Sequence, residues 1–163
     1  MENRITLGVG FAILGMSTHM VTFFLGVDSF FSTQLYFLYL LLAIYLGMRS
    51  YKRSQPEAGF RHLFKSGMQG GAIFTLLVSA FGFVYYKWIN PEYFLHRIES
   101  RVAEATQLGY SAEDIEKVRS TAEFIFSSVV DGTVSLIMFM LMSVLYSLTI
   151  TVLFRRIPAL WKG

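Results

Sequence analysis

The chain has 163 residues, of which 54% are hydrophobic, 17% aromatic and only 15% charged. A soluble domain carries about 25% charged residues, so this composition is not that of an ordinary soluble domain, and the length predicts a single domain over residues 1–163. The absence of cysteine excludes disulfides, thiolate metal sites and cysteine nucleophiles. The net charge of +3 says nothing about nucleic acid, because the basic residues set the membrane topology, and we expect no nucleic-acid partner.

Four long segments contain no Asp, Glu, Lys or Arg: residues 5–25, 30–48, 66–86 and 133–154. About 20 helical residues cross a hydrocarbon core of about 30 Å. We therefore predict an all-α integral membrane four-helix bundle with the lipid bilayer as its surroundings. The first segment is longer than the apolar region of a signal peptide, and no small-residue cleavage site follows it, so we expect it to be retained.

The first apolar segment carries small and weakly polar residues on one helical face: Gly8, Ala12, Gly15, His19 and Thr22. The third segment repeats the pattern with Gly67, Gly71 and Gly82. Because lipid tails give helices no hydrophobic reason to associate, membrane helices pack where small residues let their backbones approach. We predict that these faces pack within the monomer. Packing against a second protein or a like subunit, and lining of a polar cavity, are the alternatives.

His19 is the titratable residue that lies well inside an apolar segment, and such a residue is by default a functional hypothesis. The simpler interpretation is a neutral imidazole that is hydrogen-bonded to a Ser, a Thr or Gln34. The functional one is an intramembrane polar site that combines His19 with Gln34 and Gln69. One membrane histidine is too few for bis-His haem ligation, and His62 and His96 fall on opposite sides of the membrane, so we expect no cofactor and no metal.

Basic residues predict the orientation. Residues 49–65 contain five Lys or Arg in 17 positions, whereas residues 87–132 spread five over 46. Since short basic loops stay cytoplasmic, we expect a cytoplasmic loop over 49–65 with both termini inside. This loop is expected to touch anionic lipid headgroups, and residues 60–66 to form a short interfacial helix.

The long loop between the third and fourth spans predicts an amphipathic helical hairpin over residues 90–131 on the outer side. Asn90 as the N-cap and Pro91 at the first helical position are typical of a helix start, and Gly109 of a helix end. Ser111 followed by Asp114 resembles a capping box that begins the second helix. Apolar residues at helical spacing in both halves predict that the two helices pack together.

Three stretches carry a family resemblance: residues 59–67 (GFRHLFKSG), Tyr85-Tyr86 with residues 90–94 (NPEYF), and residues 109–116 (GYSAEDIE). With the four-span layout, the chain resembles a family of small four-helix inner-membrane proteins of unknown function, common in Bacteroidota. The resemblance implies a multi-pass protein of the bacterial inner membrane and brings no catalytic residue to map. Such genes are associated loosely with membrane glycosyltransferases acting on polyprenol carriers, which implies a partner of that kind.

The motifs of metalloproteases, serine hydrolases and phosphate-binding loops do not occur in the sequence. We therefore expect no enzyme, but a non-catalytic membrane subunit or accessory protein of the bacterial envelope. The alternative is a small, dimeric transporter or permeation pathway for a neutral or amphipathic solute, which would use His19, Gln34, Gln69 and the Ser/Thr face of the fourth helix. A third class, an enzyme acting on lipid, has no candidate base beyond His19.

Overall fold

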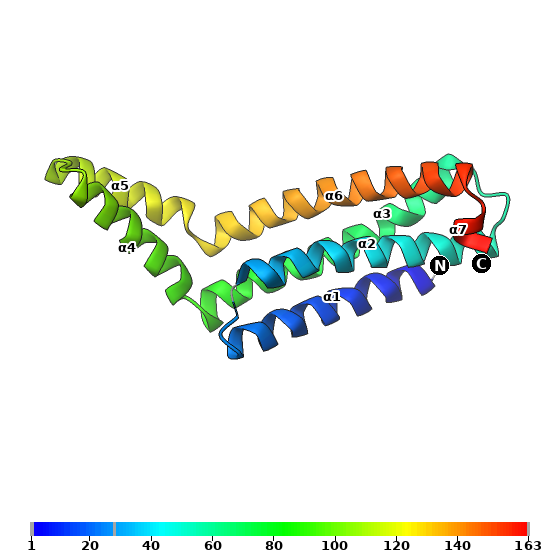
Figure 1. The fold of residues 1–163 in the computed structure, drawn as a ribbon, viewed down its shortest axis with the longest axis horizontal. Coiled ribbons are helices and arrows are strands. Elements are labelled where there is room, and N and C mark those ends of the chain that lie inside the picture. The colour runs from blue at the N-terminus through cyan, green and yellow to red at the C-terminus, as the bar shows by residue number, and fades with distance from the viewer. Residues whose placement is uncertain (1, 28, 163) are drawn as a thin grey trace. The chain divides into compact units, whose positions relative to one another are not determined.

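The computed structural model describes residues 2–27 and 29–162, and within these ranges the chain is helical with no strand. The helices, drawn in Figure 1, are α1 (Glu2–Phe24), α2 (Ser29–Ser54), α3 (Phe60–Val84), the π-helix η1 (Tyr85–Ile89), α4 (Glu92–Gln107), α5 (Ala112–Ile125), α6 (Ser128–Arg156) and α7 (Ala159–Lys162).

Four of these helical stretches are long and apolar enough to cross a membrane: Arg4–Phe24, Phe31–Ser54, Phe60–Ile89 and Ser128–Arg156. Each exceeds the roughly 20 residues that a hydrocarbon core requires. The predicted all-α architecture with four candidate spans is therefore confirmed, as is a shorter helical pair, α4 and α5, between the third and fourth spans. The chain is a multi-pass membrane protein.

The helix boundaries around the predicted 49–65 loop differ from the prediction. α2 continues to Ser54 and α3 begins at Phe60, so residues 60–66 are the first turns of α3 and not a separate interfacial helix. Charge alone does not end a helix, and Lys52 and Arg53 in the last turn of α2 favour its C-terminal dipole. The helix ends two residues before Pro56, which cannot continue it.

The chain divides into two compact units, one made of Met1–Val78 with Leu136–Gly163 and the other of Ser79–Ser135. We call them the bundle unit and the hairpin unit. α3 and α6 run through both units without a break. The single domain expected from the sequence therefore stays a prediction.

Aromatic rings occupy the centre of the bundle unit. Tyr36 of α2, Phe74 of α3 and Phe139 of α6 meet edge to face, with ring centres 6.0 to 6.5 Å apart. Ala12 of α1 and Leu40 of α2 are fully buried in the same core. Since lipid supplies no hydrophobic drive, close van der Waals packing of this kind holds membrane helices together.

The short helix α7 closes onto α2 at one end of the bundle unit (Figure 1). The Tyr45 hydroxyl donates to the Leu160 carbonyl at 2.9 Å, and Arg53 Nε donates to the Trp161 carbonyl at 2.9 Å. Lys52 is buried, with its ammonium donating to the Ala58 carbonyl at 3.0 Å and lying 5.2 Å from the Trp161 ring centre. Lys52 and Arg53, two of the basic residues predicted to contact lipid headgroups, thus form contacts within the protein.

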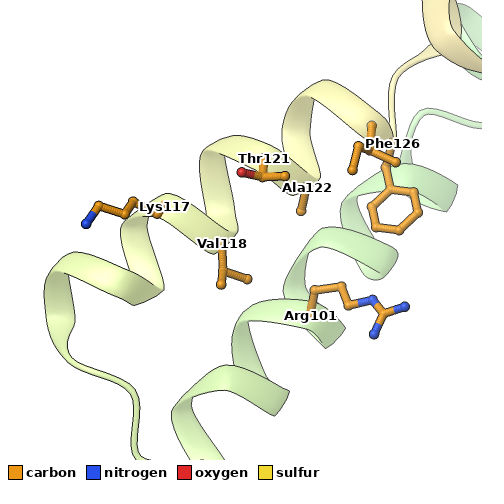
Figure 2. Close-up of a pocket in the computed structure, with 7 residues that line it drawn as sticks. Arg101, Lys117, Val118, Thr121, Ala122 and Phe126 are labelled. Atoms are coloured by element: carbon orange, nitrogen blue, oxygen red, sulfur yellow. The ribbon is translucent and has the colours of Figure 1, made fainter.

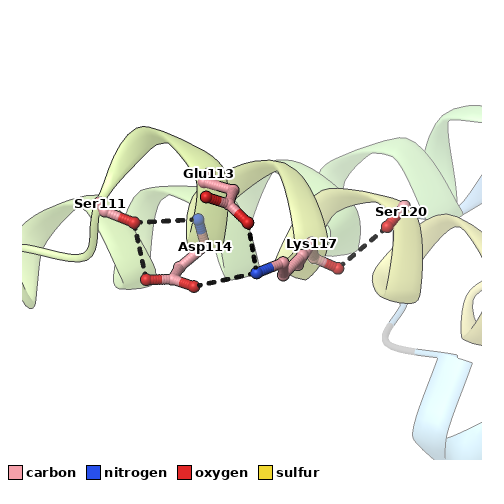
Figure 3. A network of polar contacts seen from close by, with 5 residues as sticks. All are labelled: Ser111, Glu113, Asp114, Lys117 and Ser120. Atoms are coloured by element: carbon pink, nitrogen blue, oxygen red, sulfur yellow. Dashed lines mark hydrogen bonds and ion pairs between the residues drawn. The ribbon is translucent and has the colours of Figure 1, made fainter.

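The hairpin unit follows the predicted chemistry at its turn. Gly109 has a φ of 76°, which glycine adopts without strain, and it ends α4. Ser111 caps α5: its hydroxyl accepts from the Asp114 amide at 3.2 Å and donates to the Asp114 carboxylate at 2.7 Å (Figure 3). Both predictions are confirmed.

The predicted cap at the start of α4 is wrong. Asn90 makes no cap for α4, whose N-cap is Pro91. The backbone N–H of Asn90 instead donates to the backbone carbonyl of Tyr85 at 2.8 Å and so closes the π-helix η1. A π-helix bonds residues five apart and is rare, so nothing in the local sequence distinguishes its C-cap residue from the N-cap of the next helix.

Candidate functional site

His19 lies 6% exposed on α1, where it faces α2. Its Nδ1 is 2.9 Å from the Ser32 hydroxyl, and its ring stacks on Tyr36 with ring centres 5.8 Å apart. The hydrogen-bonded imidazole considered in the sequence analysis is thus present, with a serine as partner. Gln34, also on α2, is exposed.

Gln69 belongs to a different level of the bundle unit. Its side-chain oxygen accepts from Arg4 Nη1 at 2.9 Å, and Arg4 also lies 4.4 Å from the Tyr51 ring centre. His19 is fifteen positions after Arg4 on the same helix, which corresponds to about 22 Å along the axis. The structure therefore does not bring His19, Gln34 and Gln69 together into one polar site.

The small residues of α1 lie against α2 and α3. A Cβ atom added to Gly8 would come within 2.7 Å of the Gly70 carbonyl oxygen, and one added to Gly15 within 2.7 Å of the Tyr36 ring. Such distances are too short for real atoms, so both positions need glycine. Ala12 is fully buried and Thr22 is 8% exposed on the same face.

The glycines of α3 lie against the hydroxyl face of α6. A Cβ on Gly67 would lie 2.5 Å from the Ser147 hydroxyl, and one on Gly71 would lie 2.7 Å from the Ser143 hydroxyl. Both serines are fully buried. Gly82 differs, since it is only half buried and its nearest neighbour, the Asp131 carboxylate, is 4.0 Å from an added Cβ.

Two hydroxyls on the buried face of α6 are bonded to their own helix. Ser143 donates to the Phe139 carbonyl at 2.8 Å, and Thr151 donates to the Ser147 carbonyl at 2.6 Å. Ser143 also lies 3.4 Å from the Thr75 hydroxyl of α3. Back-bonding of this kind satisfies a hydroxyl inside an apolar region, and it ties these groups to helix packing.

A cluster of aromatic and charged residues in the hairpin unit was missed by the sequence analysis. The Tyr86 ring stacks on Tyr93 at 4.9 Å, and the Arg97 guanidinium lies 5.1 Å from the Tyr93 ring centre. Arg97 also lies 5.6 Å from the ring centre of Phe126. Asp131, in the first turn of α6, interacts electrostatically with both Arg97 and Tyr86.

An open groove of about 620 Å³ lies between α4 and α5 (Figure 2). It is lined by Arg101, Lys117, Val118, Thr121, Ala122, Ile125 and Phe126. In Figure 2, Val118 and Ala122 point from α5 toward α4, whereas the Lys117 ammonium points away from the groove. That ammonium is 2.8 Å from Glu113 and 3.7 Å from Asp114 (Figure 3). Sequence periodicity predicted that these helices pack together but not that they separate enough to leave a groove.

The residues that the structure describes contain no group of three or more His, Cys, Asp or Glu placed to hold a metal ion. Neither a curated protein nor a solved structure matches the chain. A protein family does match, over residues 6–159. The match covers all four candidate spans, apart from the first two residues of the first span, and the hairpin between the third and fourth. The chain therefore belongs to the family described as protein of unknown function (DUF4199).

Proposed function

We propose that this protein is a non-catalytic subunit or accessory protein of the bacterial inner membrane, with both termini in the cytoplasm and the α4–α5 hairpin outside. The observation that carries the proposal is the hairpin itself, a pair of helices whose second member is capped by Ser111 and whose tip exposes apolar side chains. Leu108 is 65% exposed and Tyr110 50% exposed, on either side of the turn glycine Gly109.

The hairpin presents this tip on a defined backbone. Phe94, Ile98 and Ala105 of α4 are buried, as is Ala122 of α5. The ion pairs on its surface, such as Arg101 with Glu104 at 2.9 Å, are exposed and contribute only about 0–1 kcal/mol each. Apolar packing and the Ser111 cap therefore hold the hairpin, and the exposed tip is free to contact another protein.

The bundle unit supports an anchoring role. Two of its polar residues are paired within the chain, His19 with Ser32 and Gln69 with Arg4. Its glycine faces are filled by neighbouring helices of the same chain. The rival proposal, a dimeric permeation pathway, needs His19, Gln34 and Gln69 to line one route, and these residues lie at separate levels or are exposed. The accessory role is therefore the better supported of the two.

Site-specific photocrosslinking in living cells tests the proposal. A photoreactive amino acid at Tyr110 is expected to give an adduct with a second protein of discrete mass. The same group at Ser120, exposed on α5 away from the tip, serves as the matched control and is expected to give none. Peptide mass spectrometry of the adduct identifies the partner, for which the family resemblance suggests a glycosyltransferase acting on a polyprenol carrier.

Two results would contradict the accessory role. Adducts found only between two copies of this chain, together with a clean homodimer in gentle detergent, would favour the transporter alternative. Equal adducts at Tyr110 and Ser120 would show that the tip has no preferred partner.

A further inference from the structure

The groove between α4 and α5 is apolar inside and cationic along one edge. Val118, Ala122 and Ile125 contribute apolar lining from α5, and Phe126 closes one end. Arg101 lines the groove from α4, and Arg97, one turn earlier, lies 5.6 Å from the ring centre of Phe126. Two guanidinium groups therefore stand beside the end of the groove that Phe126 forms.

The charge at this edge contrasts with the charge of the hairpin. Residues 90–131 contain eight acidic and four basic residues, yet the charged residue that lines the groove from α4, Arg101, is cationic. Lys117 of α5 adds no charge inside the groove, because its ammonium points away and pairs with Glu113. Since charge complementarity selects between partners of similar shape, an apolar groove with a cationic edge favours an amphiphile with an anionic head.

The Phe126 end of the groove lies where the hairpin joins a membrane span. α6 begins at Ser128 and is a candidate span over its whole length. Around this junction large apolar side chains are exposed, with Phe124 at 72% and Val129 at 62%. Exposed apolar residues beside the end of a span are stabilised by contact with the lipid interface. The groove therefore opens next to the bilayer, and the nearest supply of an anionic amphiphile is the bilayer itself.

We propose that the groove between α4 and α5 binds one acyl chain of an anionic phospholipid, whose phosphate is held by Arg97 and Arg101. The volume of about 620 Å³ falls within the roughly 300–1,000 Å³ typical of ligand sites. Guanidinium groups suit phosphate because they bind it with two parallel hydrogen bonds. Glu104, which pairs with Arg101 at 2.9 Å, is exposed and is readily replaced by the phosphate. This site does not depend on the accessory role.

Native mass spectrometry of the full chain in an uncharged detergent tests the headgroup. With added phosphatidylglycerol, the wild-type chain is expected to retain one lipid, and with zwitterionic phosphatidylcholine far less. Arg101→Gln is expected to lower phosphatidylglycerol retention about fivefold, the loss that corresponds to one basic residue near an anionic surface. Arg119→Gln, which removes an α5 cation that does not line the groove, is the matched control and is expected to change nothing.

A photoactivatable phosphatidylglycerol tests the acyl-chain position. Its adducts are expected on residues 118–126, and Thr121→Trp, which fills the groove from an exposed position, is expected to remove them. Ser120→Trp adds the same bulk beside the groove and is expected to leave them intact. Equal retention of both lipids by wild type and Arg101→Gln would overturn the site, as would adducts confined to the lipid-facing surface of the spans. A protein crosslinked across residues 118–126 in place of lipid would reassign the groove to a protein partner.

Discussion

Gly8 of α1 packs closely against the Gly70 carbonyl of α3. A methyl group at position 8 would come within 2.7 Å of that oxygen, which belongs to backbone and has no rotamer by which to move away. We expect Gly8→Ala to lower the free energy of unfolding by about 1–3 kcal/mol, as overpacking does. Gly10→Ala is the control, because a Cβ there meets nothing within 4 Å, and alanine raises helix propensity. Denaturation of both variants in detergent measures the difference, and equal stabilities would show that α1 and α3 do not meet at Gly8.

Substitutions of His19 test whether this intramembrane histidine has a structural role or takes part in function by titrating. As a hydrogen-bonding partner of Ser32, it is replaceable by Gln, which keeps a donor and an acceptor, and His19→Gln is expected to preserve both abundance and function. His19→Leu is expected to cost about 0.6 kcal/mol, the average for a membrane hydrogen bond. In a double-mutant cycle, His19→Leu should cost much less in the Ser32→Ala background than in the wild-type chain, because the hydrogen bond is already lost there. A folded, abundant His19→Gln protein that fails to complement a deletion would instead indicate a histidine-dependent proton step.

Among the elements, α5 depends on its N-terminal cap more than on its exposed ion pairs. Ser111 both accepts from the Asp114 amide and donates to its carboxylate, and loss of such a cap costs about 1 kcal/mol. We expect Ser111→Ala to speed hydrogen exchange and proteolysis in the first turns of α5. Ser120→Ala is the matched control, since that hydroxyl only bonds back to the Lys117 carbonyl (Figure 3). If both variants exchange equally, the cap does not limit the opening of the hairpin.

The elements also show which boundaries a sequence can predict. The cap at Ser111 and the stop at Gly109 follow from local chemistry and were predictable, because each needs one particular side chain or backbone angle. The extension of α2 to Ser54 was not, because the apolar run ends at Met48 whereas the charged residues after it continue the helix. Asn90 was misassigned since a π-helix uses the same residue for another purpose.

At the scale of the whole molecule, the distribution of basic residues predicts the orientation. The five Lys or Arg of residues 49–65 should hold that segment in the cytoplasm. An alkaline phosphatase reporter fused after Leu108 is then expected to be active, because this enzyme works only outside the cytoplasm. A fusion after Lys162 is expected to be inactive and serves as the control. Activity at Lys162 with none at Leu108 would reverse the topology.

The polar sites of the molecule differ in how far the sequence could predict them. A hydroxyl partner for His19 was predictable, because a membrane imidazole needs one and Ser32 follows directly on the next helix. The cluster of Arg97 with Phe126 and Asp131 was not, because 34 residues separate Arg97 from Asp131 and only the hairpin turn brings them together. The groove between α4 and α5 could not be predicted either, because periodicity identifies the apolar face of each helix but not the distance between the two faces.

The two kinds of glycine contact have different consequences for evolution. At Gly71 the obstacle to a larger residue is the Ser143 side chain, so a change at one position is open to compensation at the other. Related sequences should therefore show correlated changes at positions 71 and 143. At Gly8 the obstacle is the Gly70 carbonyl oxygen, which every amino acid possesses. No substitution at position 70 removes it, so position 8 should stay glycine without a covarying partner, however far the family diverges.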